Sequence, residues 1–127
     1  MTQAVFDSSA VLALLNGEPG ADLVFTLAPL ALLSAVNAAE IQSRLLRKGA
    51  HARTAWESIV TAVHAVVPFD AAQAEAAGSL ILKTQPFGLS LGDRACLALG
   101  LATNSPVYTA DRAWAQLQVG VDVRLVR

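Results

Sequence analysis

Short apolar segments alternate along the chain with longer segments that carry helix-capping and helix-stopping residues. The expected strands cover residues 4–6, 30–33, 64–67, 106–109 and 121–126. The expected helices cover residues 8–15, 34–48, 51–62, 70–83, 90–103 and 112–117, with 84–92 as a loop. Apolar strands that alternate with helices form a parallel sheet covered on both faces. In such sheets, sites form outside the carboxyl ends of the strands.

Local residues define the ends of the first two helices. Ser8 or Ser9 is expected to cap the first helix, which Asn16 and Gly17 end. Ser34 is expected to cap the second, and a glycine at position 49 ends it. These cap and stop residues agree with the apolar pattern, so the α/β assignment has two independent supports.

A chain of 127 residues has the size of one domain, and we expect a single domain over residues 1–127. Hydrophobic residues make up 54% of it and charged residues only 15%, against about 25% charged in an average soluble domain. Such a chain has more apolar side chain than one small core hides easily. We therefore expect a homodimer or a partner protein to cover part of the surface.

Membrane insertion and cysteine chemistry are both disfavoured. No apolar stretch reaches the about 18 residues of a spanning helix, because Pro29, Ser34 and Asn37 interrupt the longest one. No basic residue precedes Asp7, unlike in a signal peptide, so a cytoplasmic location is expected. The single cysteine, Cys96, lies in an apolar run and is expected to be buried rather than reactive. With a net charge of −1, any contact with a nucleic acid must be local or assisted by a cation.

Asp7 and Asp111 lie where parallel α/β sheets form sites and Asp93 lies in the first turn of a helix, although each has a structural explanation as well. Asp7 follows the first expected strand, and Asp111 lies two residues beyond the fourth. Both could simply cap the next helix. Asp93 lies three residues after Ser90, where a carboxylate can complete a capping box. For each of the three, the sequence alone leaves cap and site open.

Glu40 is different, because it lies six residues beyond the Ser34 cap and is too deep in the helix for capping. The structural alternative is an exposed ion pair with Arg44, one turn later, worth about 0.2–0.5 kcal/mol. Asn37 is one turn earlier on the same face, so Glu40 and Asn37 could point together into a polar site.

Four clustered carboxylates would repel one another unless a divalent cation neutralised them. Hard oxygen ligands suit Mg²⁺, and Mn²⁺ can replace it. Such a centre can activate a water and stabilise phosphate charge during an in-line attack on a phosphodiester. The acids therefore point to metal-dependent phosphodiester hydrolysis.

Four motifs in order carry a family resemblance: VFDSSA at 5–10, NAAE at 37–40, LGDRA at 91–95 and YTADRAW at 108–114. Together they resemble the motifs of PIN domains, and most closely those of VapC-type toxins. The resemblance implies a three-layer α/β/α sandwich with a mainly parallel five-stranded sheet. It also implies a Mg²⁺- or Mn²⁺-dependent endoribonuclease that cleaves RNA as the toxin of a toxin–antitoxin pair. The cognate antitoxin would cover the site and bring DNA binding only indirectly.

The resemblance assigns a role to each position. Asp7 and Asp93 match the family's principal metal ligands, and Glu40 and Asp111 match its remaining catalytic acids. The flanking polar positions, expected to orient the acids or waters, are Ser9, Asn37 and Thr109. The fifth acid found in some members is absent, since Ala115 and Gln116 occupy that stretch, which leaves a second metal site open.

Other residues and other functions fit less well. Arg94 and Arg112 each follow an acid and could contact a phosphate, but charge balancing in solvent is the simpler explanation. His51 and His64 lie outside the acidic motifs. A receiver-type phosphoacceptor domain would need an acidic pair after the first strand, whereas Asp7 is followed by serines. A PIN-like binding module that has lost catalysis is the remaining alternative, although all four acids are present.

Overall fold

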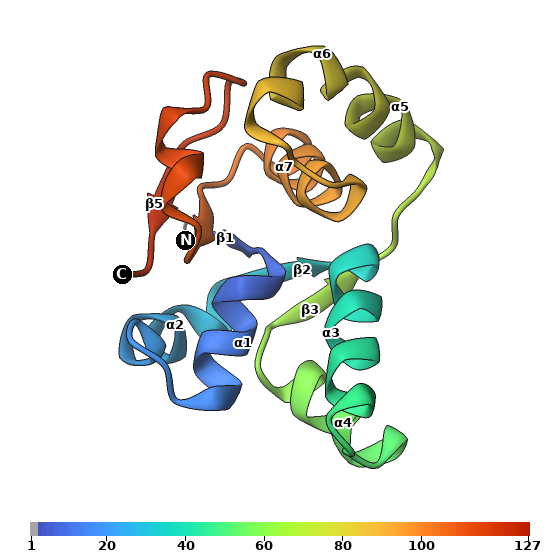
Figure 1. Ribbon diagram of the computed structural model, residues 1–127, viewed down its shortest axis with the longest axis vertical. Helices are drawn as coiled ribbons and strands as arrows, with labels where there is room; N and C mark the ends of the chain where they lie inside the picture. Colours follow the sequence, from blue (N-terminus) through green and yellow to red (C-terminus); the bar gives the residue numbers. More distant parts are fainter. Residues whose placement is uncertain (1–2) are drawn as a thin grey trace.

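The computed structural model describes residues 3–127, and a five-stranded parallel sheet forms its centre (Figure 1). Its strands are short and follow the order β3-β2-β1-β4-β5. Their bounds are β1 Ala4–Phe6, β2 Ala31–Ser34, β3 Ala65–Val67, β4 Val107–Thr109 and β5 Val123–Leu125. All four pairings are parallel. The expected five-stranded α/β sheet is therefore confirmed.

The strand order also separates this fold from the receiver-type alternative. In doubly wound sheets of the flavodoxin type the order is 2-1-3-4-5, whereas β1 here lies between β2 and β4. This central position of β1 brings its carboxyl end close to those of β2 and β4. Side chains that follow these three strands can therefore meet.

Helices cover both faces of the sheet (Figure 1). One face carries α1 to α4, and the other carries α5 to α7. Their bounds are α1 Ser8–Asn16, α2 Ala21–Leu27, α3 Ala35–Arg47, α4 Ala52–Thr61, α5 Ala71–Ser79, α6 Ile81–Thr84 and α7 Leu91–Thr103. Short 3₁₀ turns lie at η1 Ala28–Leu30, η2 Gln85–Phe87 and η3 Arg112–Gln116. The three-layer arrangement is the expected one.

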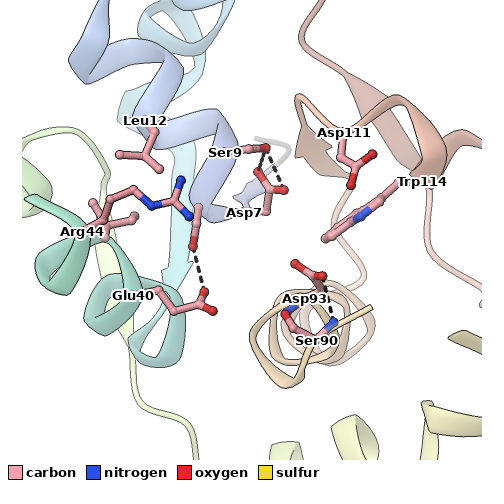
Figure 2. A pocket seen from close by; sticks show the side chains of 11 residues that line it. Asp7, Ser9, Leu12, Glu40, Arg44, Ser90, Asp93, Asp111 and Trp114 are labelled. Atoms are coloured by element: carbon pink, nitrogen blue, oxygen red, sulfur yellow. Dashed lines mark hydrogen bonds between the residues drawn. The ribbon is translucent and has the colours of Figure 1, made fainter. Parts of the chain in front are cut away.

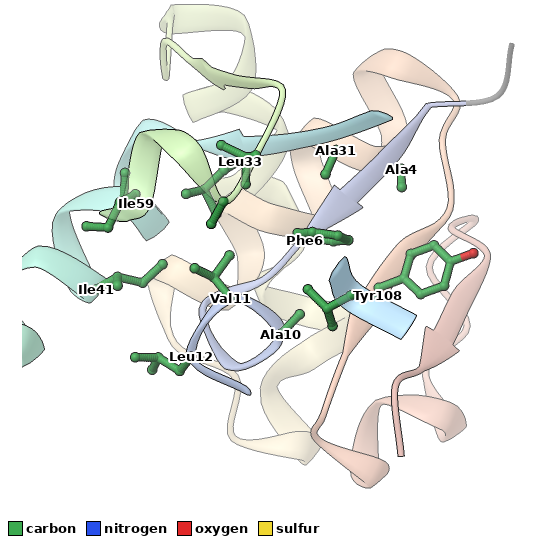
Figure 3. Close-up of a cluster of buried hydrophobic side chains, with 14 of the residues drawn as sticks. Ala4, Phe6, Ala10, Val11, Leu12, Ala31, Leu33, Ile41, Ile59 and Tyr108 are labelled. Atoms are coloured by element: carbon green, nitrogen blue, oxygen red, sulfur yellow. The ribbon is translucent and has the colours of Figure 1, made fainter. Parts of the chain in front are cut away.

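Successive strand residues supply two separate cores, as the alternation of side chains in a strand requires. Phe6 of β1 packs with Val11, Leu33 and Ile41 on the side of α1, α3 and α4 (Figure 3). Val5, the preceding residue, packs on the other side with a cluster that includes Cys96, Leu97, Leu99, Val107 and Trp114. Helix α1 and helix α7 are thus fixed on opposite faces, one on each side of β1.

Most helix ends follow the expected capping residues, with one correction. The first helix is capped by Asp7, whose carboxylate accepts from the Ala10 N–H, and not by Ser8 or Ser9. Ser34 caps α3 as expected. Ser90 and Asp93 form the full reciprocal capping box at the start of α7. Because the helix begins at Ser8, Asp7 is the residue directly before it, and a side chain at that position reaches the free N–H groups of the first turn.

Two helical segments differ from the expectation. Helix α2 was not expected, because it is short, begins after Gly20 without a side-chain cap and buries only Val24. The helix expected over 70–83 is broken at Leu80 into α5 and α6, just after Gly78 and Ser79, which have low helix propensity. Neither segment lies at the carboxyl edge of β1, so the placement of the acids is unaffected.

Within residues 3–127, no single helix is long and apolar enough to cross a membrane. The segments Ser8–Asn16 and Ala21–Leu30 together have the length and composition of a membrane span, but the chain bends by 111° between them.

Candidate metal site at the carboxyl edge of the sheet

All four acids predicted from the sequence line one pocket at the carboxyl edge of the sheet (Figure 2). Asp7 follows β1, Glu40 lies on α3, Asp93 on α7, and Asp111 follows β4. The pocket has a volume of about 230 Å³. Its other lining residues are Ser8, Ser9, Leu12, Ile41, Arg44, Ser90 and Trp114. Acids as distant in sequence as Asp7 and Asp111 are therefore gathered at one pocket, as the motif pattern predicted.

Asp7 is only 4% exposed, and its carboxylate accepts hydrogen bonds from three residues. The Ser9 hydroxyl lies 2.7 and 2.9 Å from its two oxygens. The Thr109 hydroxyl donates to Oδ2 over 2.6 Å, and the Ala10 N–H donates to Oδ1 over 2.8 Å. These donors stabilise a carboxylate that has lost most of its contact with water.

The same two hydroxyls connect Asp7 to the loop that carries Asp111. Ser9 Oγ accepts from the Ala110 N–H at 2.9 Å, and Thr109 Oγ1 accepts from the Asp111 N–H at 3.0 Å. Asp111 itself caps η3 by accepting from the Ala113 N–H. Ser9 and Thr109 therefore fix the relative position of two acids, in agreement with the orienting role expected for them.

Glu40 is held from two sides and makes no ion pair with Arg44. Its Oε1 accepts from the Ser8 hydroxyl and from the Asn37 Nδ2 group, each at 2.9 Å. Asn37 is buried, and the same Nδ2 group donates to the Gly92 carbonyl at 3.0 Å. The ion pairs of residues 3–127 do not include Glu40, so the ion-pair explanation is wrong.

Asp93 serves as a helix cap and as a wall of the pocket. Its Oδ2 accepts from the Ser90 N–H at 3.0 Å, and its own N–H donates to Ser90 Oγ at 3.2 Å. Burial raises the pKa of Asp93 above its ordinary value of 3.8, although the hydrogen bonds from Ser90 lower it. The negative charges of Glu40 and Asp111 raise it further. The four acids thus share one electrostatic environment.

Burial dominates the ionisation of Asp7. Desolvation raises its pKa from 3.8 to about 6, against the opposing effect of the hydrogen bonds from Thr109, Ser9 and Ala10. The charge of Asp93 adds a smaller increase. Burial also raises the pKa of the Cys96 thiol well above its usual range, which agrees with an inert core cysteine.

The donor set fits a hard divalent cation by its chemistry. Four carboxylates line the pocket, and within residues 3–127 none of them pairs with a basic side chain. As the side chains lie, no three acidic, histidine or cysteine groups of the described chain form a cluster that could hold a metal ion directly. Mg²⁺ needs no such cluster, because it commonly takes one or two carboxylates and keeps several waters.

Ser8, Arg44 and Trp114, which line the pocket, were not predicted as site residues, and neither was Gly92, which lies against Glu40. Ser8 holds Glu40, Arg44 projects into the pocket (Figure 2), Gly92 contacts the Glu40 carboxylate, and Trp114 is a buried part of the wall. Only Gly92 gave a hint in the sequence, since a glycine in the first turn of a helix commonly has a packing reason. The others depend on side-chain directions that spacing does not show.

The remaining candidates lie elsewhere. Arg94 Nη1 donates to the Ala77 carbonyl at the end of α5, and Arg112 Nη1 donates to the Arg127 carbonyl. Neither lines the pocket. Arg112 is exposed, as charge balancing in solvent requires, whereas Arg94 is half-buried against α5, so the solvent explanation is wrong for Arg94. His51 precedes α4, and His64 lines a separate cavity with Gln3 and Leu30, so neither histidine is part of the acidic site.

The raised pKa of Asp7 predicts a pH-dependent stability in the metal-free protein. A folded pKa of about 6 against 3.8 means that the folded state binds this proton more tightly than the unfolded chain. The stabilising contribution of protonated Asp7 is therefore complete below about pH 4 and lost as the pH rises through about 6. Relative to Asp7→Asn, the wild type should lose on the order of 3 kcal/mol over this range.

Urea unfolding of both proteins in EDTA, repeated across this pH range, measures that difference. Asp70→Asn is the matched control, because Asp70 also caps a helix but lies outside the pocket. The difference in unfolding free energy between Asp70→Asn and the wild type should change less with pH. If the difference in unfolding free energy between wild type and Asp7→Asn stays constant from acid to neutral pH, the pKa of Asp7 is not raised in the folded state.

Comparisons with known proteins match both the sequence and the fold of the chain. The PIN domain family model matches residues 4–120. A toxin–antitoxin complex from Klebsiella pneumoniae is 18% identical, covers 98% of each chain and has a TM-score of 0.75. DNA-bound VapBC from Salmonella typhimurium is 13% identical over 100% of each chain, with a TM-score of 0.74. VapC20 of Mycobacterium tuberculosis, described as a sarcin–ricin loop cleaving toxin, is 20% identical, covers 94% of this chain and 99% of its own, and has a TM-score of 0.71.

No curated protein sequence matches the chain. At these low identities the solved structures show a shared fold, whereas the family model matches most of the sequence itself. The matched region includes all four motifs and therefore all four acids of the pocket. The chain belongs to the PIN-domain family.

Proposed function

We propose that this protein is a Mg²⁺-dependent endoribonuclease that hydrolyses RNA phosphodiester bonds as the toxin of a toxin–antitoxin pair. The observation that carries the proposal is the convergence of Asp7, Glu40, Asp93 and Asp111 on one pocket, where none of them forms an ion pair with a basic side chain of residues 3–127. Mn²⁺ is the expected substitute for Mg²⁺.

Asp7 and Asp93 are the proposed metal ligands. Both have a raised pKa, which a bound cation would lower again by favouring the charged form. Glu40 and Asp111 would hold the water shell of the ion. When bound, the cation activates a water and stabilises charge on the phosphate. Ser9, Thr109 and Asn37 hold the acids in place through the hydrogen bonds described above.

The comparisons support the substrate and the partner of this proposal. VapC20 is described as cleaving the sarcin–ricin loop, which is an RNA. The Klebsiella and Salmonella structures are complexes of toxin and antitoxin, and the latter is bound to DNA. We propose that this chain also pairs with an antitoxin, and that DNA contacts arise only through that partner.

Arg44 is proposed to contact a phosphate of the RNA. It is the one basic residue of the described chain that lines the pocket, and it makes no ion pair there. In Figure 2 its guanidinium group lies on the pocket side of α3, above Glu40. A positive side chain at this position would attract the RNA backbone and offset part of the repulsion from the carboxylates.

The first test of the function is Asp93→Asn. This change removes one negative charge at nearly constant shape, and it should abolish cleavage of total cellular RNA in Mg²⁺. Asp70→Asn, at a helix cap outside the pocket, should cleave like the wild type. EDTA should stop the wild type, and added Mg²⁺ should restore it. Cleavage that persists in excess EDTA, in protein free of contaminating nuclease, would refute the metal dependence.

The second test is Arg44→Gln in the Asp93→Asn background, where RNA is bound without being cut. Loss of one phosphate contact should weaken binding and reduce the slope of log Kd against log salt by about 0.7. Arg47→Gln removes the same charge from the same helix but not from the pocket, so its salt slope should change less. Equal slopes for the two variants would show that Arg44 acts only through net charge.

The third test concerns assembly. Large apolar side chains are exposed on both helical layers, and the most exposed are Phe25 at 70% and Leu82 at 81%. We propose that a second copy of the chain and the antitoxin cover such surfaces. Light scattering of the purified protein should give the mass of a dimer, and a monomer at all concentrations would contradict the homodimer.

A further inference from the structure

Gly92, the second residue of α7, has no room for a side chain. A Cβ atom built there would overlap Glu40 Oε2 and would lie 2.5 Å from Cδ and Oε1 of the same carboxylate. Gly92 is not among the glycines with positive φ, so the backbone conformation does not require glycine. The three atoms nearest to an added Cβ all belong to Glu40, so this one carboxylate is what excludes a side chain at position 92.

Hydrogen bonds hold the Glu40 carboxylate against Gly92. Ser8 and Asn37 both donate to Oε1, and the Asn37 amide also donates to the Gly92 carbonyl. The first turn of α7 is fixed in turn by the capping box of Ser90 and by the buried residues that follow it. Contact with the Gly92 backbone is therefore part of the geometry that places Glu40 beside Asp93.

We propose that Gly92 is a positioning residue, which allows α3 and α7 to approach closely enough for Glu40 to face the same pocket as Asp93. This inference rests on the proposed function in so far as Glu40 serves catalysis. A methyl group at position 92 displaces the carboxylate rather than the helix, because the carboxylate is the end of a flexible side chain and α7 is packed in the core. Its effect falls on the site and not on the fold.

The experiment compares Gly92→Ala with Glu40→Ala and with the double variant. Gly92→Ala should remain folded, with a melting temperature in EDTA close to that of the wild type. Its RNA cleavage should fall by about 10²-fold, the effect of misplacing a catalytic group by about 1 Å. The rise in melting temperature on adding Mn²⁺ should shrink to the value of Glu40→Ala.

The double variant supplies the decisive comparison. Once Glu40 is alanine, the methyl group at position 92 meets no carboxylate, so Gly92→Ala should cause no further loss of cleavage or of the Mn²⁺ shift. Gly78→Ala is the matched control, because Gly78 is also helical, has no atom near its missing Cβ and lies outside the pocket. It should leave cleavage and the Mn²⁺ shift unchanged.

Three outcomes would overturn the inference. These are wild-type cleavage and Mn²⁺ response in Gly92→Ala, additive losses in the double variant, or a crystal structure of Gly92→Ala in which the carboxylate still accepts from Ser8 and Asn37. The crystal structure also distinguishes a failure of this inference from a failure of the proposed function. If the wild type neither cleaves RNA nor responds to Mn²⁺, the proposed function fails, whereas a displaced Glu40 in the variant still upholds the steric coupling.

Discussion

The buried carboxylate of Asp7 is the constraint around which the carboxyl edge of the sheet is built. It is 4% exposed, at the end of the central strand, and its donors come from α1 and from the end of β4. A buried charge without such donors would cost several kcal/mol. Because Ser9 and Thr109 are also bonded to the loop of Asp111, satisfying Asp7 fixes the position of a second acid as well.

Capping and site roles coincide in this protein. Asp7 caps α1, Asp93 completes the capping box of α7, and Asp111 caps η3, yet all three line the same pocket. In a parallel α/β sheet the helix that follows a strand begins at the carboxyl edge, so N-terminal caps gather there. The sequence left cap and site as alternatives for each aspartate, and the structure shows that each one both caps a helix and lines the pocket.

The parts of the fold that follow from local chemistry could be predicted from the sequence. Apolar strands bounded by caps gave the sheet, and the motif spacing gave four acids in one pocket. Helix α2 could not be predicted, because it has no capping side chain and buries only Val24. Two further contacts depend on how α7 packs against α5 and α3: that of Arg94 with Ala77 and that of Gly92 with Glu40. Residue spacing in one sequence does not reveal such packing between helices.

Helix capping alone does not explain the choice of aspartate at these positions. Serine and asparagine cap helices about as well as aspartate, and both are uncharged. Desolvation raises the pKa of Asp7 and of Asp93, so at both positions the fold carries a charge that burial disfavours. A neutral cap would keep the capping hydrogen bond without the desolvation cost, and at position 93 also without the repulsion from Glu40 and Asp111. Because capping is served equally well without charge, the charge at these positions is consistent with the proposed site, in which a bound cation would make it favourable.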